Sequence, residues 1–192
     1  VKFREDGISM GSGGVPFRAD IPMVVHSFVT SACTCKLKKV MSYKEKLARE
    51  GLDLNVRGER GRTALQMAAW YGRADVLCWL LEEGATFDTW DDDIWSPLHY
   101  AAEWDKQETV KILLAHGDDM HKKDNNGVSP LEAARRMNCR VALVFKEAES
   151  PAGLAQLKQD VLELELEYKT KRAEIEAAVD TASGAPAAEA SA

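Results

Sequence analysis

The residues best suited to chemistry in this sequence are its four cysteines and four histidines. Cys33 and Cys35 stand one residue apart and could hold a metal ion or take part in thiol exchange, with His26 as the nearest histidine. No second cysteine pair and no further histidine at ligand spacing accompanies them. The sequence therefore predicts no metal site and no cofactor, and its scattered cysteines favour a reducing, intracellular compartment.

Other catalytic patterns are equally weak. Four glycines near the start, at 7, 11, 13 and 14, do not have the strand before and the helix after that a phosphate-binding loop needs. No Ser-His-Asp, Cys-His or paired-carboxylate arrangement has a pattern around it that would enclose a pocket. We therefore predict a protein that is not an enzyme.

Charge and hydropathy exclude two more classes of partner. The 25 Lys and Arg residues against 31 Asp and Glu residues give a net charge of -6, and no basic run could neutralise nucleic acid phosphates. No stretch reaches the roughly 18 consecutive apolar residues of a membrane span.

The chain starts at Val1 rather than at Met, so we expect that a targeting peptide, a pro-segment or other upstream sequence precedes it. This expectation leaves plastid and mitochondrion open as compartments.

The clearest organising feature is an internal repeat with a period of 33 residues. Segments 61–69, 94–102 and 127–135 align at this offset, and Thr63, Ser96 and Ser129 share one phase. A second block, 80–85, aligns with 113–118 at the same offset. Hydroxyl side chains of this kind suit a helix N-cap, and Pro97 and Pro130 then stand at the first helical position, where a missing N–H costs nothing.

This period, with its Thr/Ser-Pro-Leu-His-x-Ala motif, resembles the ankyrin repeat over residues 57–148. The resemblance implies an all-α solenoid of stacked helix-turn-helix repeats with β-finger loops. It also implies that His99 makes a structural hydrogen bond and that Asp91 stabilises a turn. A solenoid this thin offers a groove rather than an enclosed pocket, which agrees with the absence of catalytic patterns. The predicted domain organisation is an extended N-terminal arm over 1–26; a repeat domain over 27–149, divided into a degenerate repeat 27–55 and repeats 56–88, 89–121 and 122–149; a long amphipathic helix over 150–179; and an Ala/Ser/Pro-rich tail over 180–192.

The two ends depart from the repeat pattern. We expect the first helix of the degenerate repeat around Thr30 to Lys39, and an extended apolar strip over 21–25. Apolar residues at heptad spacing predict the long helix, whose apolar seam needs a mate. The mate could be the open end of the last repeat, a partner's helix or a second copy of the chain, and we favour the first two, so a homo-oligomer is not expected. Leu162 and Leu166 widen the stripe and suit packing on a broad surface.

In ankyrin repeats the fingers and first helices line one concave face. The position of a residue within the 33-residue repeat therefore indicates whether it is one of the variable positions on that face. Four of the five tryptophans fall in this set. Trp, Tyr, Met and Arg are enriched at protein interfaces, whereas a single indole could equally shield an irregular neighbouring repeat. The predicted partner-binding residues are Arg60, Arg62, Trp70, Tyr71, Trp90, Asp92, Asp93, Trp95, Glu103, Trp104, Arg136 and Met137.

Three functions fit this organisation. The first is an adaptor or scaffold module that binds a partner protein in the aromatic groove. The second is a structural accessory subunit of a large multiprotein complex, inside or outside an organelle, held by its terminal arms and long helix. The third is a regulatory fragment of an enzyme whose catalytic part lies elsewhere.

Overall fold

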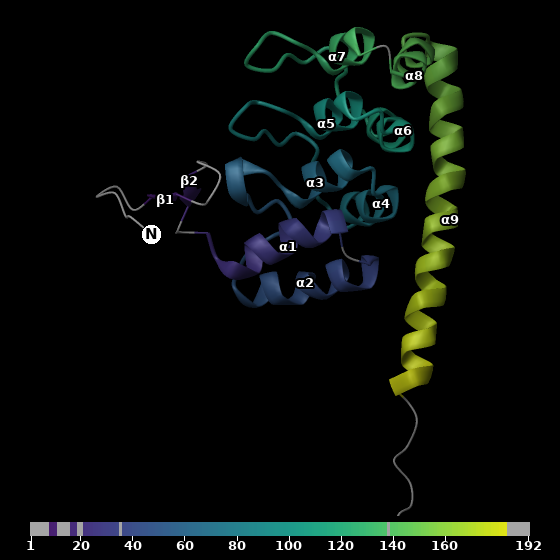
Figure 1. Ribbon diagram of the computed structural model, residues 1–192. Coiled ribbons are helices and arrows are strands. Elements are labelled where there is room, and N and C mark those ends of the chain that lie inside the picture. The colour runs from purple at the N-terminus through teal and green to yellow at the C-terminus, as the bar shows by residue number, and fades with distance from the viewer. Residues whose placement is uncertain (1–7, 11–15, 19–20, 35, 138, 184–192) are drawn as a thin grey trace, which may run out of the picture.

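The computed structural model describes residues 8–10, 16–18, 21–34, 36–137 and 139–183, with side chains from Ile21 to Glu174 (Figure 1). Three helix pairs carry the repeat: α3 (Ala64–Tyr71) with α4 (Ala74–Glu82), α5 (Pro97–Glu103) with α6 (Gln107–Ala115), and α7 (Pro130–Arg136) with α8 (Val141–Ala148). They are preceded by α1 (Met23–Thr34) and α2 (Leu37–Arg49), and followed by α9 (Pro151–Ser183). Before α1, β1 (Ile8–Met10) pairs antiparallel with β2 (Pro16–Arg18), Ser9 lying opposite Phe17.

The helices stack in two rows. The inner row is α1, α3, α5 and α7, each packed on the next, and the outer row is α2, α4, α6 and α8. Finger loops project from the inner row on the side away from α9 (Figure 1). Small residues such as Ala68, Ala69, Ala101 and Ala102 are fully buried and let the inner helices approach closely. This confirms the predicted all-α ankyrin solenoid with a long C-terminal helix.

Three of the inner helices, α3, α5 and α7, start with a capping box. The side chains of Thr63, Ser96 and Ser129 accept hydrogen bonds from the backbone N–H three residues on, and Gln66, His99 and Glu132 return the bond to the cap. The side chains of Gln66 and His99 also contact the following repeat. Gln66 Nε2 lies 2.7 Å from the Trp95 carbonyl oxygen, and His99 Nε2 lies 3.3 Å from that of Val128. Glu132 carries no donor in its ionised form, so this ladder of bonds ends at the third repeat.

The N-terminal boundary of the repeats differs from the prediction. α1 begins at Met23, so residues 23–25 are helical instead of extended, and the helix expected around Thr30 to Lys39 is interrupted after Thr34. The reason is the spacing of Val25, Phe28, Val29 and Ala32, which places four apolar side chains on one helical face, where all four are buried. The predicted arm therefore overlaps the first turn of α1, and most of the arm lies outside the described residues.

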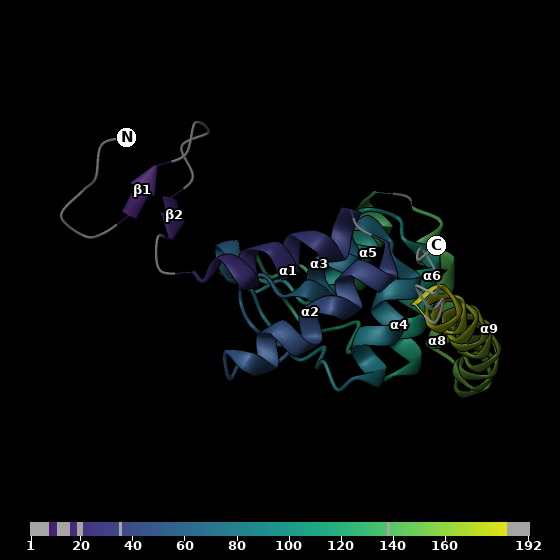
Figure 2. The same cartoon turned by 90° about the horizontal axis from the view of Figure 1, so that it is seen from below.

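The long helix also differs from the prediction in where it packs. α9 does not cap the open end of the last repeat; it runs back along the outer row and contacts α8, α6 and α4 (Figure 2). Leu157 and Val161 are each 4% exposed, whereas Leu162 is 59% and Leu166 62% exposed, so these two leucines do not widen the packed stripe as expected. The helix extends to Ser183, past the predicted end at 179, and the rest of the predicted tail lies outside the described residues.

Polar contacts complete the docking of α9. The Tyr168 hydroxyl donates to Glu108 Oε1 at 3.0 Å, His116 Nε2 lies 2.7 Å from Glu165 Oε1, and Arg172 Nη1 lies 2.6 Å from Glu82 Oε2. The seam of α9 is therefore matched within the chain. Within the described part of the chain, no helix has the length and apolar character needed to cross a membrane.

Candidate functional site

Aromatic side chains from two inner helices form a continuous cluster on the finger side of the solenoid. Trp70 of α3 lies 5.2 Å from Tyr100 and 4.9 Å from Trp104, measured between ring centroids. Trp95, just before α5, lies 5.0 Å from Tyr100 and 6.0 Å from Trp104. Tyr71 extends the cluster, with its ring centroid 5.7 Å from that of Trp70. The aromatic cluster, defined as these five residues, spans two repeats.

Tyr100 is the centre of this cluster, and it was not among the predicted site residues. Its hydroxyl accepts a hydrogen bond from Arg62 Nε at 2.8 Å and donates one to Asp91. Burial, and then the bond to Asp91, raise the pKa of Tyr100 well above its ordinary value, so the hydroxyl stays protonated. The equivalent inner-helix positions of the adjacent repeats hold Met67 and Ala133. A phenol at this position needs a polar partner for its hydroxyl. This difference in residue type was the sequence signal that could have identified Tyr100.

Arg62 covers one end of the aromatic cluster. Its guanidinium carbon lies 4.7 Å from the centroid of the Trp70 ring and 5.6 Å from that of Tyr100. The nearest carboxylate oxygen, Asp91 Oδ2, lies 3.8 Å from Arg62 Nε. This cation is therefore held by aromatic faces and by a buried carboxylate together.

Two aspartates fix the finger loops beside the cluster. Asp91 Oδ1 accepts hydrogen bonds from the backbone amides of Asp93 and Trp95, and Asp124 Oδ1 does the same for Asn126 and Val128. The second oxygen of Asp124 accepts the Trp95 indole N–H at 3.0 Å. Burial opposes the ionisation of Asp124, but these bonds outweigh it and lower its pKa. The orientation of the Trp95 ring is thereby fixed.

A pocket of about 210 Å³ opens between α5 and α7, next to Trp95. Glu103 and Arg136 stand among its polar wall residues, and Met137 contributes to its apolar surface. Burial lowers the pKa of His99, which also lines the pocket, so its imidazole is neutral near pH 7. The remaining lining residues are Asp124, Asn126, Val128 and Ala133.

The structure brings most of the predicted site residues onto this face. Arg62, Trp70, Tyr71, Trp95 and Trp104 meet in or on the aromatic cluster. The ring and cation contacts of Trp70 are with Arg62 and with rings of its own and the following repeat.

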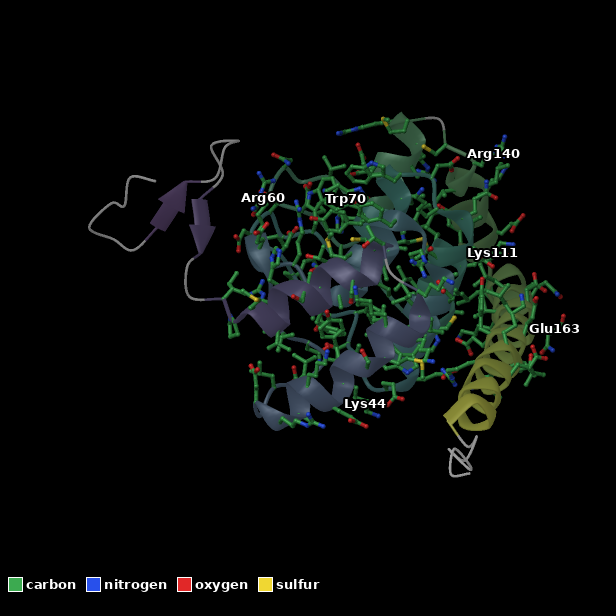
Figure 3. All side chains as sticks on the ribbon, turned by 60° about the horizontal axis from the view of Figure 1, so that its bottom comes forward. Lys44, Arg60, Trp70, Lys111, Arg140 and Glu163 are labelled. Carbon is green, nitrogen blue, oxygen red and sulfur yellow. The ribbon has the colours of Figure 1, made fainter. Side chains whose placement is uncertain are left out.

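The remaining predicted residues lie beside the aromatic cluster or apart from it. Asp92 and Asp93 are exposed on the second finger, with the Asp92 amide bonded to the Arg60 carbonyl at 3.0 Å. Arg60 and Trp70 lie on one side of the molecule, and Glu163 of α9 lies on another (Figure 3). Trp90 makes no ring contact with the cluster within the described residues, and its ring lies 3.7 Å below Lys122 Nζ.

The alternative site at Cys33 has a structural explanation. The buried thiol of Cys33 donates to the Thr30 carbonyl oxygen at 2.7 Å, as expected of a cysteine within a helix. Cys35 lies outside the described residues. Among the residues that are described, no three His, Cys, Asp or Glu side chains gather as metal ligands would.

Comparisons with known proteins agree with the repeat pattern. A family model for ankyrin repeats in many copies matches residues 47–101, and one for three copies matches residues 87–149, together more than half of the chain. Among curated proteins, the chain is 38% identical over 74 residues to protein phosphatase 1 regulatory subunit 12A of Mus musculus, covering 38% of this chain and 7% of that protein.

Two other relatives match longer stretches. The chain is 30% identical over 102 residues to palmitoyltransferase AKR1 of Saccharomyces cerevisiae, covering 53% of the chain and 13% of that protein. It is 33% identical over 120 residues to zygote-specific protein 3 of Chlamydomonas reinhardtii, covering 62% of the chain and 32% of that protein. In each of these three cases the match spans less than a third of the relative's length.

Proposed function

This chain belongs to the ankyrin-repeat family, and from that premise we propose that it is a non-catalytic adaptor which binds a partner protein on its aromatic cluster. Ankyrin repeats are protein-interaction modules, and that general role applies to this chain. The specific proposal is the surface: the finger side of α3, α5 and α7, with the aromatic cluster at its centre.

The observation that carries the proposal is the exposure of large aromatic groups at this surface. Tyr71 is 49% exposed and Trp104 is 41% exposed, beside the half-buried rings of Trp70 and Trp95. Contiguous apolar surface of this kind mostly marks binding sites, and Trp and Tyr are the residues that contribute most to protein interfaces. The rings already pack on one another, so little side-chain entropy would be lost on binding.

The names of the relatives support a modular role. A phosphatase regulatory subunit and a palmitoyltransferase share the repeat region with this chain while differing in everything their names describe. The matched region therefore carries no enzyme activity over to this chain. It supports an interaction module that different proteins use with different partners.

A second candidate function is an accessory subunit of a larger complex, attached through α9 and the N-terminal arm. The exposed Leu162 and Leu166 on α9 favour it, because they form an apolar strip of two residues on the face turned away from the solenoid. The docked seam of α9 counts against it, since Leu157 and Val161 are already buried within the chain.

One experiment separates the two functions. The tagged chain is used to capture partners from its native source, alongside a Trp95→Ala/Trp104→Ala variant and a Leu162→Ser/Leu166→Ser variant, each checked for folding by circular dichroism. Quantitative mass spectrometry then compares recovery. Loss of the main partner with the tryptophan variant alone would support the adaptor. We expect each of the two substitutions to reduce the binding free energy by about 2 kcal/mol. Loss with the leucine variant alone would contradict it and favour the accessory subunit.

A further inference from the structure

We propose that the pocket between α5 and α7 receives a cationic side chain, arginine or lysine, from the segment of the partner that lies on the aromatic cluster. This inference rests on the proposed function of that surface and specifies the chemistry of what it binds.

The size of the pocket suits one side chain. Its volume of about 210 Å³ is below the roughly 300 to 1,000 Å³ of sites that enclose a small molecule or cofactor. Its lining includes the apolar residues Val128, Ala133 and Met137, and also an aromatic residue, Trp95, and an acidic residue, Glu103. This combination matches a residue with an aliphatic stem and a charged head.

The molecule already contains the same arrangement once. At the other end of the aromatic cluster, Arg62 lies over Trp70 and Tyr100 and next to the Asp91 carboxylate. An aromatic face beside a carboxylate therefore holds a guanidinium within this chain. Trp95 and Glu103, an aromatic and an acidic residue, both line the pocket, and Glu103 makes no ion pair among the described residues.

The charges around the pocket favour a cation over an anion. Among the described residues, no Lys, Arg or His nitrogen lies within 4.0 Å of a carboxylate oxygen of Glu103, which lines the pocket. The other acidic group of the lining, Asp124, is already engaged by the Trp95 indole and two backbone amides. An incoming cation would therefore find one acidic side chain, Glu103, that has no ion pair among the described residues.

Arg136 is the cation that could compete, because it also lines the pocket. Its charge also acts on Glu132. The pKa of Glu132 is lowered first by the hydrogen bond from the Ser129 amide, and then by the charges of Lys123 and Arg136. Arg136 is exposed and makes no ion pair with Glu103 in the described structure, so the Glu103 side of the pocket remains negative.

The test uses the full chain and a phage-displayed library of random linear peptides as the probe. Peptides are selected on the wild-type chain, and those that bind the Trp95→Ala/Trp104→Ala variant at least about tenfold more weakly, a change of about 1.4 kcal/mol, are kept as ligands of the aromatic surface. We expect these peptides to share an Arg or Lys at one position. Replacing that residue by citrulline or acetyl-lysine should weaken binding about tenfold, because the charge is lost while the shape is kept.

Two variants of the chain complete the test. Glu103→Gln should weaken the same peptides about tenfold, whereas the matched Glu163→Gln on α9 should leave them unchanged, since Glu163 is exposed on the helix that lies behind the outer row (Figure 3). Peptides that depend on the tryptophans but share no cation, or that ignore Glu103→Gln, would overturn the inference and leave the adaptor function intact. Peptides that bind the tryptophan variant as well as wild type would contradict both.

Discussion

At the scale of single residues, Asp118 is a buried carboxylate at a position where the preceding repeat has Ala85. One of its oxygens accepts the Asp119 amide at 2.9 Å, and the other has no hydrogen-bond partner among the described residues. Burial raises its pKa from 3.8 to about 7. The native state therefore binds a proton more tightly than the unfolded chain does at this site.

This shift makes stability depend on pH in a defined direction. Protonated Asp118 contributes stability that is fully present below its unfolded pKa of 3.8 and is lost as pH rises through about 7. A pKa shift of this size corresponds to at most roughly 4 kcal/mol in the free energy of unfolding. Relaxation of the structure around Asp118 should reduce this contribution to about 1 to 3 kcal/mol. Asp118→Ala should thus stabilise the protein near pH 8 and have little effect near pH 4, as measured by urea unfolding at both pH values. An equal effect at both values would show that the carboxylate titrates normally; exposed Asp119→Asn is the matched control.

Ile94 holds a backbone conformation that its side chain disfavours. Its φ is 59°, and the residues at the same phase of the neighbouring fingers, Gly61 and Gly127, have φ values of 69° and 73°. A β-branched residue in this left-handed region costs about 1 to 2 kcal/mol, and the exposed side chain recovers little of it by burial. In this finger, Ile94 directly follows Asp92 and Asp93 and directly precedes Trp95 of the aromatic cluster.

Replacing Ile94 by Gly should therefore stabilise the fold. We expect a gain of about 0.5 to 1 kcal/mol in the free energy of unfolding, because relief of strain exceeds the extra entropy of glycine in the unfolded chain. Ile94→Ala, which keeps the steric penalty, is the control and should gain less. Chemical denaturation measures both, and a Gly variant less stable than wild type would mean that Ile94 makes packing contacts that outweigh its strain.

The residues of the site were predictable only where aligning one repeat with another showed which positions are equivalent. Phase placed Trp70, Trp95 and Trp104 on the same face because the repeat period fixes which positions point there. Tyr100 stands at the unspecified position of the Pro-Leu-His-x-Ala motif, and phase could not show that its ring would stack among the tryptophans and bond to Arg62 and Asp91. Such contacts depend on side-chain conformations, which periodicity does not specify.

At the scale of elements, α9 offers a direct comparison between its two faces. Leu157 is 4% exposed against the outer row, and Leu162 on the same helix is 59% exposed. Leu157→Ala should cost about 2 to 4 kcal/mol, whereas Leu162→Ala should change stability by less than about 0.5 kcal/mol, since both residues are good helix formers. Urea unfolding of the two variants measures the difference. The reverse order would mean that α9 packs in solution through its other face.

The sequence predicted that α1 and α9 exist but not where they pack. For α1, the repeat period placed the helix too late in the chain, while the spacing of Val25, Phe28, Val29 and Ala32 marked its true position. For α9, the heptad pattern indicated a long helix with one apolar seam. An apolar seam does not identify the surface on which it packs, because the open end of the last repeat, the outer row and a second copy of the chain would each offer an apolar surface.

At the scale of the whole molecule, two features join the repeats lengthwise. On the finger side, Gln66 and His99 donate to carbonyl groups of the following repeat, and Glu132 ends that ladder. Behind the outer row, α9 contacts α8, α6 and α4, so a single helix spans three repeats. In a solenoid, each repeat otherwise contacts only its neighbours, and stability depends on those local interfaces. A helix that crosses three repeats should make their unfolding more cooperative.

Ending the chain after Ser150 tests this role of α9. Loss of the buried Leu157 and Val161 should lower the free energy of unfolding by roughly 3 to 6 kcal/mol, and the loss should be largest in α6 and α8, which α9 contacts most. Hydrogen exchange followed by mass spectrometry should then show faster exchange in α6 and α8, while α1 and α3, which lie in the inner row, keep most of their protection. Leu157→Ala in the full chain is the milder control and should shift the same helices in the same order. Uniform loss of protection in all helices would mean that the stack already unfolds as one unit without α9, and that the helix adds stability without adding cooperativity.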